Sequence, residues 1–362
     1  MKIGIDAKWY FDGPVSAKVL LQNVLDNLID QKKSDEVILF VKKSDFMRAR
    51  NHFPDDITIV PIKKFLNNAL TNIFIFPFYI FFLKLDVLLC QYYSPLFFKS
   101  KTAVYIYDLL WTDYPQYFSL KERFYFDLAI PGLRKAKAVI TISQSEYERI
   151  EKNISNRKGK LFQFHLGADH FSAVNDVPYQ SCFFEPLEKF ILCVGRLNDR
   201  KNIKVVVDAL RMINEEVHLV VVGAKSHQYT SLDSHISDYK LERRIRFLGH
   251  ISDKELSYLY SKAYVFCFPS FCEGFGLPPL EAMKLGCPVI ASNATSMPEI
   301  CGEAALYFDP NDYRGLADII NEISNENRCE LIKKGYDRVE KFNWSKTSKK
   351  LLSVLRTEFE NK

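Results

Sequence analysis

Two glutamates, Glu273 and Glu281, stand on either side of a loop rich in glycine and proline, in the stretch "PSFCEGFGLPPLEAMKLGCPVIAS" at residues 269–292. Glycine carries no side chain, so the backbone of such a loop can approach another molecule closely. Pro278 and Pro279 suit the first turn of a helix, where amide hydrogens have no partner inside the helix. We therefore expect Glu281 in that first turn and Glu273 across the loop from it. The amides between the two carboxylates would face a ligand, which could be anionic.

Two cationic side chains, Arg196 and Lys201, follow an apolar segment in "ILCVGRLNDRKNI" at residues 191–203. The predicted strand ends at Gly195, so both cations lie at its carboxyl end, beside the start of a helix. Two positive charges in that position suit a diphosphate group. The plainer interpretation is a solvated basic turn, the usual environment of such a sequence on its own. The presence of the two glutamates in the same half of the chain favours the diphosphate.

The spacing of apolar segments predicts two α/β domains in the 362 residues. Segments such as "EVILFV" and "AVITIS" alternate with helical stretches, and the alternation restarts at "FILCVG" after a linker expected at 172–189. This pattern is typical of parallel sheets covered on both faces. We predict two Rossmann-like, doubly wound domains, at residues 1–175 and 185–342, facing each other across a cleft. A predicted helix from about 343 to 362 is a candidate to pack back on the first domain.

Several classes of protein are disfavoured by motifs that the sequence lacks. No G-x-G-x-x-G follows "KIGID" or "FILCVG", and no G-x-x-x-x-G-K-[ST] occurs, which argues against dehydrogenases and nucleoside triphosphatases. The eight cysteines form no C-x-x-C pair and are expected to be reduced thiols of an intracellular protein, without a metal site. The start "MKIGIDAKWYF" has a strand-like pattern with an acidic residue in it, so we do not expect it to be a signal peptide. These features together predict a cytoplasmic protein.

The net charge of +5 belongs to the first half of the chain. Residues 1–175 hold 24 Lys and Arg against 18 Asp and Glu, whereas residues 176–362 hold 25 against 26. This modest excess favours an anionic membrane surface and is too weak to indicate nucleic acid. The apolar run "IFIFPFYIFFL" at 73–83 has two interpretations. It is either a buried helix beside the strand "DVLLC", or an aromatic face that rests on a membrane with Lys63 and Lys64 nearby.

From residue 191 to 310 the sequence resembles the C-terminal half of the family-4 retaining glycosyltransferases of the GT-B fold, of the type that builds bacterial surface polysaccharides. The resemblance rests on "VGRLNDRKNI", on the segment that begins "FLGHISDKELSYLYSKAYVFCFPS", and on the two glutamates separated by seven residues. Weaker similarity covers the N-terminal half through "IDAKWYFDG", "YDLLWTDYPQYF", "KAVITIS" and "HLGAD". The resemblance implies an acceptor-side first domain and a second domain that binds a nucleotide-sugar donor.

The resemblance also implies roles for individual residues. It implies that Arg196 and Lys201 neutralise the donor's diphosphate, that Glu273 accepts hydrogen bonds from the donor sugar, and that Glu281 accepts them from the ribose. The residues that it makes catalytic are Glu273, Arg196, Lys201 and Asp108. The residues that it assigns to donor binding are Gly13, Tyr107, Gly195, Gly274, Phe275, Gly276, Leu277 and Glu281. No metal is expected, because the chain lacks a D-x-D triplet.

The sequence departs from the family pattern in two places. Tyr107 stands before Asp108 where the family often has a histidine that contacts the donor sugar. Tyr107 is therefore either a different sugar contact, or a sign of weakened turnover, or a core aromatic at a strand end. The first loop reads "FDGPVSAKV", with Gly13 in place of a glycine pair, and Lys18 is an additional candidate to contact the phosphates.

The expected activity is that of a retaining, metal-independent hexosyltransferase without a cofactor. It would move a sugar from a GDP- or UDP-linked donor to a growing glycan or lipid-linked acceptor, in the biosynthesis of lipopolysaccharide, capsule or another surface polysaccharide. Its expected place is the cytoplasm, with peripheral contact at the inner face of the plasma membrane, and no nucleic acid is an expected partner. The alternative is a catalytically weak sugar-nucleotide-binding partner of a glycan-assembly complex.

Overall fold

The chain folds into two α/β units, each built on one parallel sheet. The computed structural model describes residues 1–63, 67–171, 189–224 and 231–360. The first unit comprises Met1–Gly167 with Asn343–Lys362, and the second comprises Ala168–Phe342. The prediction of two parallel-sheet α/β domains is confirmed. The predicted linker at 172–189 lies outside the described residues, apart from its last residue, and so does Lys64. The predicted cleft between the two domains stays a prediction.

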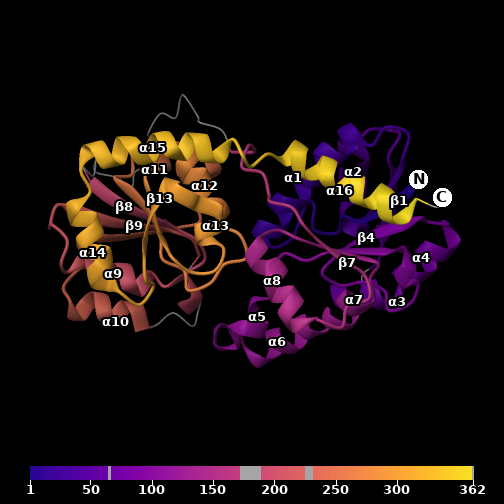
Figure 1. The fold of residues 1–362 in the computed structure, drawn as a ribbon, viewed down its shortest axis with the longest axis horizontal. Coiled ribbons are helices and arrows are strands. Elements are labelled where there is room, and N and C mark those ends of the chain that lie inside the picture. The colour runs from indigo at the N-terminus through magenta and orange to yellow at the C-terminus, as the bar shows by residue number, and fades with distance from the viewer. Residues whose placement is uncertain (64–66, 172–188, 225–230, 361–362) are drawn as a thin grey trace. The chain divides into compact units, whose positions relative to one another are not determined.

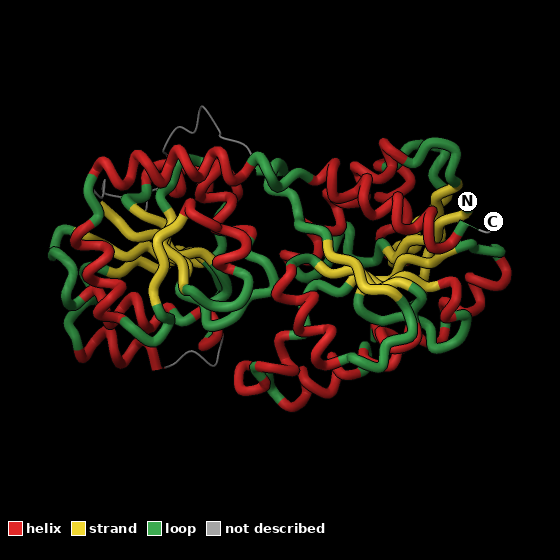
Figure 2. The backbone as a smooth tube through the Cα atoms, in the orientation of Figure 1, coloured by secondary structure: helices red, strands yellow, loops and turns green. Residues whose placement is uncertain are grey.

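The first unit contains a seven-stranded sheet in the order β3-β2-β1-β4-β5-β6-β7, with every pairing parallel. Its central strands β1, β4 and β5 are buried along almost their whole length because helices cover both faces, as Figure 2 shows for the yellow strands between red helices. The strands are β1 (Lys2–Asp6), β2 (Glu36–Lys42), β3 (Thr58–Ile62), β4 (Val87–Gln91), β5 (Thr102–Tyr105), β6 (Ala138–Thr141) and β7 (Lys160–Gln163). The α-helices are α1 (Val15–Gln31), α2 (Phe46–His52), α3 (Asn68–Phe74), α4 (Phe76–Phe82), α5 (Leu110–Asp113), α6 (Leu120–Asp127), α7 (Ile130–Lys135), α8 (Gln144–Asn153) and α16 (Trp344–Phe359).

The second unit contains a six-stranded parallel sheet in the order β10-β9-β8-β11-β12-β13. The strands are β8 (Lys189–Val194), β9 (Val217–Val222), β10 (Ile245–Gly249), β11 (Val265–Phe268), β12 (Val289–Ser292) and β13 (Ala305–Phe308). The α-helices are α9 (Ile203–Leu210), α10 (Ser231–Asp238), α11 (Asp253–Lys262), α12 (Leu277–Lys284), α13 (Met297–Cys301), α14 (Tyr313–Glu322) and α15 (Asn325–Val339). The order reverses between β8 and β11, and the carboxyl ends of strands at such a switch point are where open α/β sheets bind ligands.

The last helix, α16, belongs to the first unit and lies along α1 (Figure 1). The side chains of Leu351 and Leu355 on α16 are fully buried, and the hydroxyl of Ser348 donates a hydrogen bond of 3.0 Å to the carbonyl oxygen of Val24 on α1. Gly167 lies against the start of α16, where a Cβ atom would be only 2.3 Å from the amide nitrogen of Trp344. A glycine is therefore needed at this close approach of two backbone segments.

The apolar run at 73–83 forms the end of α3 and all of α4, and only one side of it is buried. Phe76 and Ile80 are fully buried in the core, whereas Phe78, Phe81 and Phe82 are 60%, 63% and 71% exposed. The interpretation as a wholly buried helix is therefore wrong for this face. The run is apolar all round, and the sheet can cover one side only. Over the residues that the structure describes, no helix has the length and apolar character to cross a membrane.

Candidate functional site

The predicted basic turn follows β8 and depends on two residues with positive φ. Gly195 has a φ of 147°, and a Cβ atom there would lie 3.1 Å from Cε of Lys201. Asn202, with a φ of 53°, donates side-chain hydrogen bonds to the carbonyl oxygens of Pro269 (3.1 Å) and Pro310 (2.7 Å). The turn thus packs the stem of Lys201 over Gly195 and is tied by Asn202 to the loop that follows β11.

The loop between β11 and α12 is held by hydroxyl side chains that follow β12. The amide of Glu273 donates to the hydroxyl oxygen of Thr295 over 2.9 Å, and the hydroxyl of Ser296 donates to the carbonyl oxygen of Phe275 over 2.6 Å. Gly276 ends the loop with a φ of 126°, which L-residues with a side chain rarely adopt. Because its backbone is held by these bonds, the loop places the carboxylate of Glu273 at one defined position.

The carboxylate of Glu273 pairs with two cations from the basic turn. Its Oε1 lies 2.7 Å from Nζ of Lys201, and its Oε2 lies 3.0 Å from Nη1 of Arg200. The same Nη1 donates to the carbonyl oxygen of Cys272 over 2.6 Å. Burial alone would raise the pKa of Glu273, but the charges of Arg200 and Lys201 outweigh burial and lower this pKa to about 2. Glu273 is therefore an anion at every physiological pH.

The second glutamate, Glu281, lies in α12 in a different electrostatic environment. The helix begins at Leu277, so Glu281 falls in its second turn, and its predicted place in the first turn is wrong. The hydroxyl of Tyr260 donates to its Oε2 over 3.2 Å, and Nε2 of His170 lies 3.8 Å from its Oε1. Burial raises the pKa of Glu281 to about 7. Burial, followed by the charge of Lys284, lowers the pKa of His170, so the His170–Glu281 contact is not an ion pair at neutral pH.

The predicted residues of the first unit lie at the carboxyl end of its sheet and in its first loop. Tyr107 is buried, its hydroxyl donates to the side-chain oxygen of Gln91, and burial raises its pKa well above the ordinary value. Asp108, next in the chain, is half-buried. A Cβ atom on Gly13 would lie 2.7 Å from Cβ of Trp9, so this loop also needs a glycine. The interpretation of Tyr107 as a core aromatic fits these contacts.

Among the predicted residues of the second unit, the structure brings Gly195, Lys201 and Glu273 together. Glu281 contacts other side chains, and Arg196 is exposed, while Arg200 stands beside Glu273. The supporting residues that sequence reasoning missed are Arg200, Asn202, Thr295, Ser296, Tyr260 and His170. Arg200 could have been predicted because it stands next to Lys201 in "DRK". The hydroxyl side chains of Thr295 and Ser296 could have been predicted from the polar run "SNATS" at the end of β12. Within the described residues no group of three or more His, Cys, Asp or Glu side chains is placed to hold a metal ion. The roles of all these residues stay predictions.

The two glutamates predict opposite dependences of stability on pH. The pKa of Glu273 is lowered from 4.5 to about 2, so its ion pairs stabilise the fold above pH 4.5 and are lost as the pH falls toward 2. The pKa of Glu281 is raised from 4.5 to about 7, so its burial costs stability increasingly as the pH rises across that interval. Above pH 7 we expect Glu273→Gln to lower the Tm and Glu281→Gln to raise it. The Tm of the wild type and of both variants, measured from about pH 2 to above pH 7, tests this expectation. If the Tm of the two variants followed the same dependence on pH, the two electrostatic environments described above would be contradicted.

Comparison with known proteins finds a family match within the second unit. Residues 183–338 match the model of the glycosyl transferases group 1 family. The chain is 29% identical over 235 residues to O-antigen chain mannosyltransferase B of Escherichia coli, and 28% identical over 238 residues to O-antigen chain mannosyltransferase RfbU of Salmonella typhimurium. These alignments cover 62% and 65% of this chain, and the chain spans 62% and 64% of the two relatives' lengths.

A solved structure extends the likeness to the fold of the whole chain. HepE of Anabaena, in complex with UDP-glucose, aligns with a TM-score of 0.70 over 99% of both chains at 17% identity. At this identity the likeness is one of fold. Residues 183–338 are therefore a domain of the glycosyl transferases group 1 family, in a chain that has the GT-B fold.

Proposed function

We propose that this protein is a retaining glycosyltransferase that moves a hexose from a nucleoside-diphosphate sugar to a growing glycan or lipid-linked acceptor of a cell-surface polysaccharide. The observation that carries the proposal is the contact of Glu273 with Lys201 and Arg200 inside the group 1 domain. The O-antigen mannosyltransferases among its relatives support the class of acceptor, and the UDP-glucose complex of HepE supports a nucleotide-sugar donor. In this proposal the second unit binds the donor and the first unit binds the acceptor.

The charges around Glu273 suit the departure of a diphosphate. Two cations and one carboxylate leave one net positive charge, which would stabilise the negative charge that develops on the leaving group. The ionised Glu273 can only accept hydrogen bonds, as the hydroxyls of a donor sugar require. With a pKa of about 2 it is too weak a base to remove a proton from an acceptor. The leaving diphosphate would take that proton, as expected for a retaining enzyme of this class.

The environment of Glu281 suits the binding of neutral hydroxyls. Its carboxylate has one hydroxyl donor, Tyr260, at 3.2 Å, and burial opposes its ionisation. Two ribose hydroxyls would donate to the ionised form and lower its pKa, because hydrogen bonds to a carboxylate favour its charge. Donor binding below pH 7 would then release a proton from Glu281.

We also propose a peripheral contact with the inner face of the plasma membrane. Such a contact would bring the enzyme to a lipid-linked acceptor. The excess of 24 cationic over 18 acidic residues in residues 1–175 supports it, because an anionic surface attracts that half of the chain.

The proposed activity is tested by incubating the purified chain with UDP- and GDP-linked hexoses in EDTA and measuring released nucleoside diphosphate. We expect release that is accelerated by a lipid-linked acceptor and unaffected by EDTA, because cationic side chains do the work of a metal. Tight nucleotide binding without any release would instead support the catalytically weak binding partner, for which the internally bonded Tyr107 is the motivation. Activity that EDTA abolishes would contradict metal independence.

Substitutions of the three basic residues of the turn after β8 are expected to have different effects. Lys201→Ala should cost about 2–4 kcal/mol of transition-state stabilisation, the usual scale for one such electrostatic contact. Arg200→Ala should also lower the Tm, because it leaves a buried carboxylate with one cation fewer. Arg196→Ala should weaken nucleotide binding at an unchanged Tm, since Arg196 is exposed. Lys204→Ala, which removes an exposed charge from α9, is the matched control. Unchanged affinity for UDP and GDP in all three variants would show that the turn is only a solvated surface.

The two glutamates should affect different kinetic constants. Glu281→Gln should mainly raise KM, because contacts to a ribose change little as the sugar leaves. Glu273→Gln should lower kcat more than it raises KM, because its contacts to the sugar strengthen as the ring gains positive character. Initial rates over a range of donor concentrations separate the two constants. If Glu281→Gln changes stability without changing donor affinity, the assignment of this residue to the ribose is wrong.

A further inference from the structure

A cluster of phenylalanine side chains in the first unit is exposed to solvent. Phe74 at the end of α3 and Phe78, Phe81 and Phe82 on α4 are 50–71% exposed. Phe97 and Phe98, before β5, are 67% and 42% exposed. These six belong to thirteen exposed large hydrophobic side chains among the described residues, and the other seven lie elsewhere in the chain. A contiguous exposed apolar patch usually marks an interaction site, because a soluble surface otherwise minimises such patches.

The exposed rings of α4 form one stripe of that helix. Positions 78, 81 and 82 are three and four residues apart and therefore share a face. The opposite face, with Phe76 and Ile80, is fully buried, and the ring of Phe40 lies 5.2 Å from that of Phe76. The helix is thus anchored in the core of its unit by one face, and the exposed stripe is held firmly at the surface.

The stretch of sequence that carries these rings has an excess of positive charge. Residues 63–101 contain five lysines, at positions 63, 64, 84, 99 and 101, and a single acidic residue, Asp86. The carboxylate of Asp86 is half-buried and accepts a hydrogen bond of 2.7 Å from the amide of Lys2. Lys84 is exposed at the end of α4. The partner that fits this surface is therefore apolar and anionic together.

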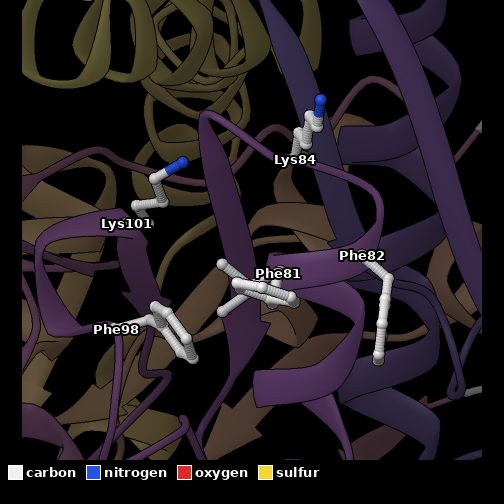
Figure 3. Close-up of a pocket in the computed structure, with 6 residues that line it drawn as sticks. Phe81, Phe82, Lys84, Phe98 and Lys101 are labelled. Atoms are coloured by element: carbon white, nitrogen blue, oxygen red, sulfur yellow. The ribbon is translucent and has the colours of Figure 1, made fainter.

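The rings and two of the lysines enclose a shallow pocket of about 380 Å³, lined by Ile80, Phe81, Phe82, Lys84, Phe98 and Lys101. The rings of Phe81 and Phe98 lie 6.5 Å apart. In Figure 3 the ammonium groups of Lys84 and Lys101 lie on one side of the pocket and the rings of the three phenylalanines on the other. Lys101 is held there by a hydrogen bond of 2.7 Å to the carbonyl oxygen of Leu85.

We propose that this surface, formed by the exposed phenylalanines of α3, α4 and residues 97–98 with Lys84 and Lys101, docks the first unit on an anionic lipid bilayer. The rings enter the boundary between headgroups and acyl chains, and the two ammonium groups contact lipid phosphates. A seven-residue helix is about 10 Å long, which is too short to cross a bilayer, so in this proposal α4 lies at the interface between water and lipid. The inference deepens the membrane contact of the proposed function by naming its surface, and its test does not use sugar transfer.

A bilayer fits this surface better than a second copy of the chain does. In a twofold symmetric dimer the same patch would face itself, and Lys84 and Lys101 would then oppose the same lysines of the second copy, because the residues that line the pocket include no acidic side chain. The phenylalanine ring also has a large apolar surface and no hydrogen-bonding group. It therefore suits contact with acyl chains, which offer no hydrogen-bond partners. The charge excess beside the rings matches the negative potential of an anionic leaflet.

The test is flotation of the full-length protein with phosphatidylcholine vesicles, with and without phosphatidylglycerol. We expect binding that requires phosphatidylglycerol and weakens with salt. The double variant F81S/F82S should lose binding about tenfold or more because two inserted rings are removed. K84E should lose binding about thirtyfold, since near such a surface each unit of charge is worth about 1 kcal/mol, the substitution changes two units, and about 1.4 kcal/mol corresponds to tenfold. Because all three side chains are exposed, the variants are expected to keep the wild-type Tm.

Two control variants remove equally exposed groups elsewhere in the first unit. L120S/F124S removes side chains of α6 that are 78% and 73% exposed, and K121E reverses an exposed lysine on the same helix. Both should bind vesicles as the wild type does. Equal losses in test and control variants would overturn the proposal, as would vesicle binding that is absent or indifferent to phosphatidylglycerol. Sedimentation of the protein alone tests the second copy, and a dimer that F81S/F82S dissociates would also overturn it.

Discussion

The contact of Glu273 with Lys201 and Arg200 is the interaction on which the second unit's candidate site depends. Glu273 is 9% exposed, and a buried carboxylate costs several kcal/mol to desolvate unless cations and hydrogen bonds compensate for it. The two cations lie at 2.7 and 3.0 Å, and their effect on the pKa of Glu273 shows that they more than offset burial. The loop after β11 can therefore bury the ionised carboxylate of Glu273 only when the turn after β8 supplies Lys201 and Arg200.

This dependence follows from the order of the strands. The turn after β8, the loop after β11 and the hydroxyls after β12 lie far apart in the sequence, yet β8, β11 and β12 are neighbours in the sheet. Their carboxyl ends therefore meet at one edge, where the side chain of Asn202 bridges two loops and Thr295 holds the amide of Glu273. A parallel sheet with a reversal of order brings together residues that no short sequence motif contains.

The sequence predicted those parts of the fold and site that depend on local pattern. Alternating apolar segments identified the main parallel strands of both sheets, and the glycines, glutamates and cations were visible as types and spacings. What it missed depends on distances across the sheet. Arg200 and Arg196 are both cations of one turn, and only the fold decides which of them stands beside Glu273. The place of Glu281 was wrong by one turn because α12 begins at Leu277, before the two prolines. The sequence left open whether the run at 73–83 is buried or carries an exposed aromatic face, because hydrophobicity alone cannot distinguish a buried ring from an exposed one.

The two glutamates lie in the same loop and helix, yet their charges are controlled in opposite ways. Glu273 is held ionised by fixed cations, whereas burial raises the pKa of Glu281 to about 7, and a hydroxyl and a neutral imidazole lie beside its carboxylate. Because the Glu273 charge is constant, pH cannot alter the part of the site that would face the reacting sugar. Because the Glu281 charge is not constant, a ligand that donates hydrogen bonds to its carboxylate must also displace the proton in those molecules in which Glu281 is still protonated. Glu273, which is suited to a role in the reaction, therefore keeps its charge at physiological pH. Glu281, which is suited to binding, has a charge that depends on the pH.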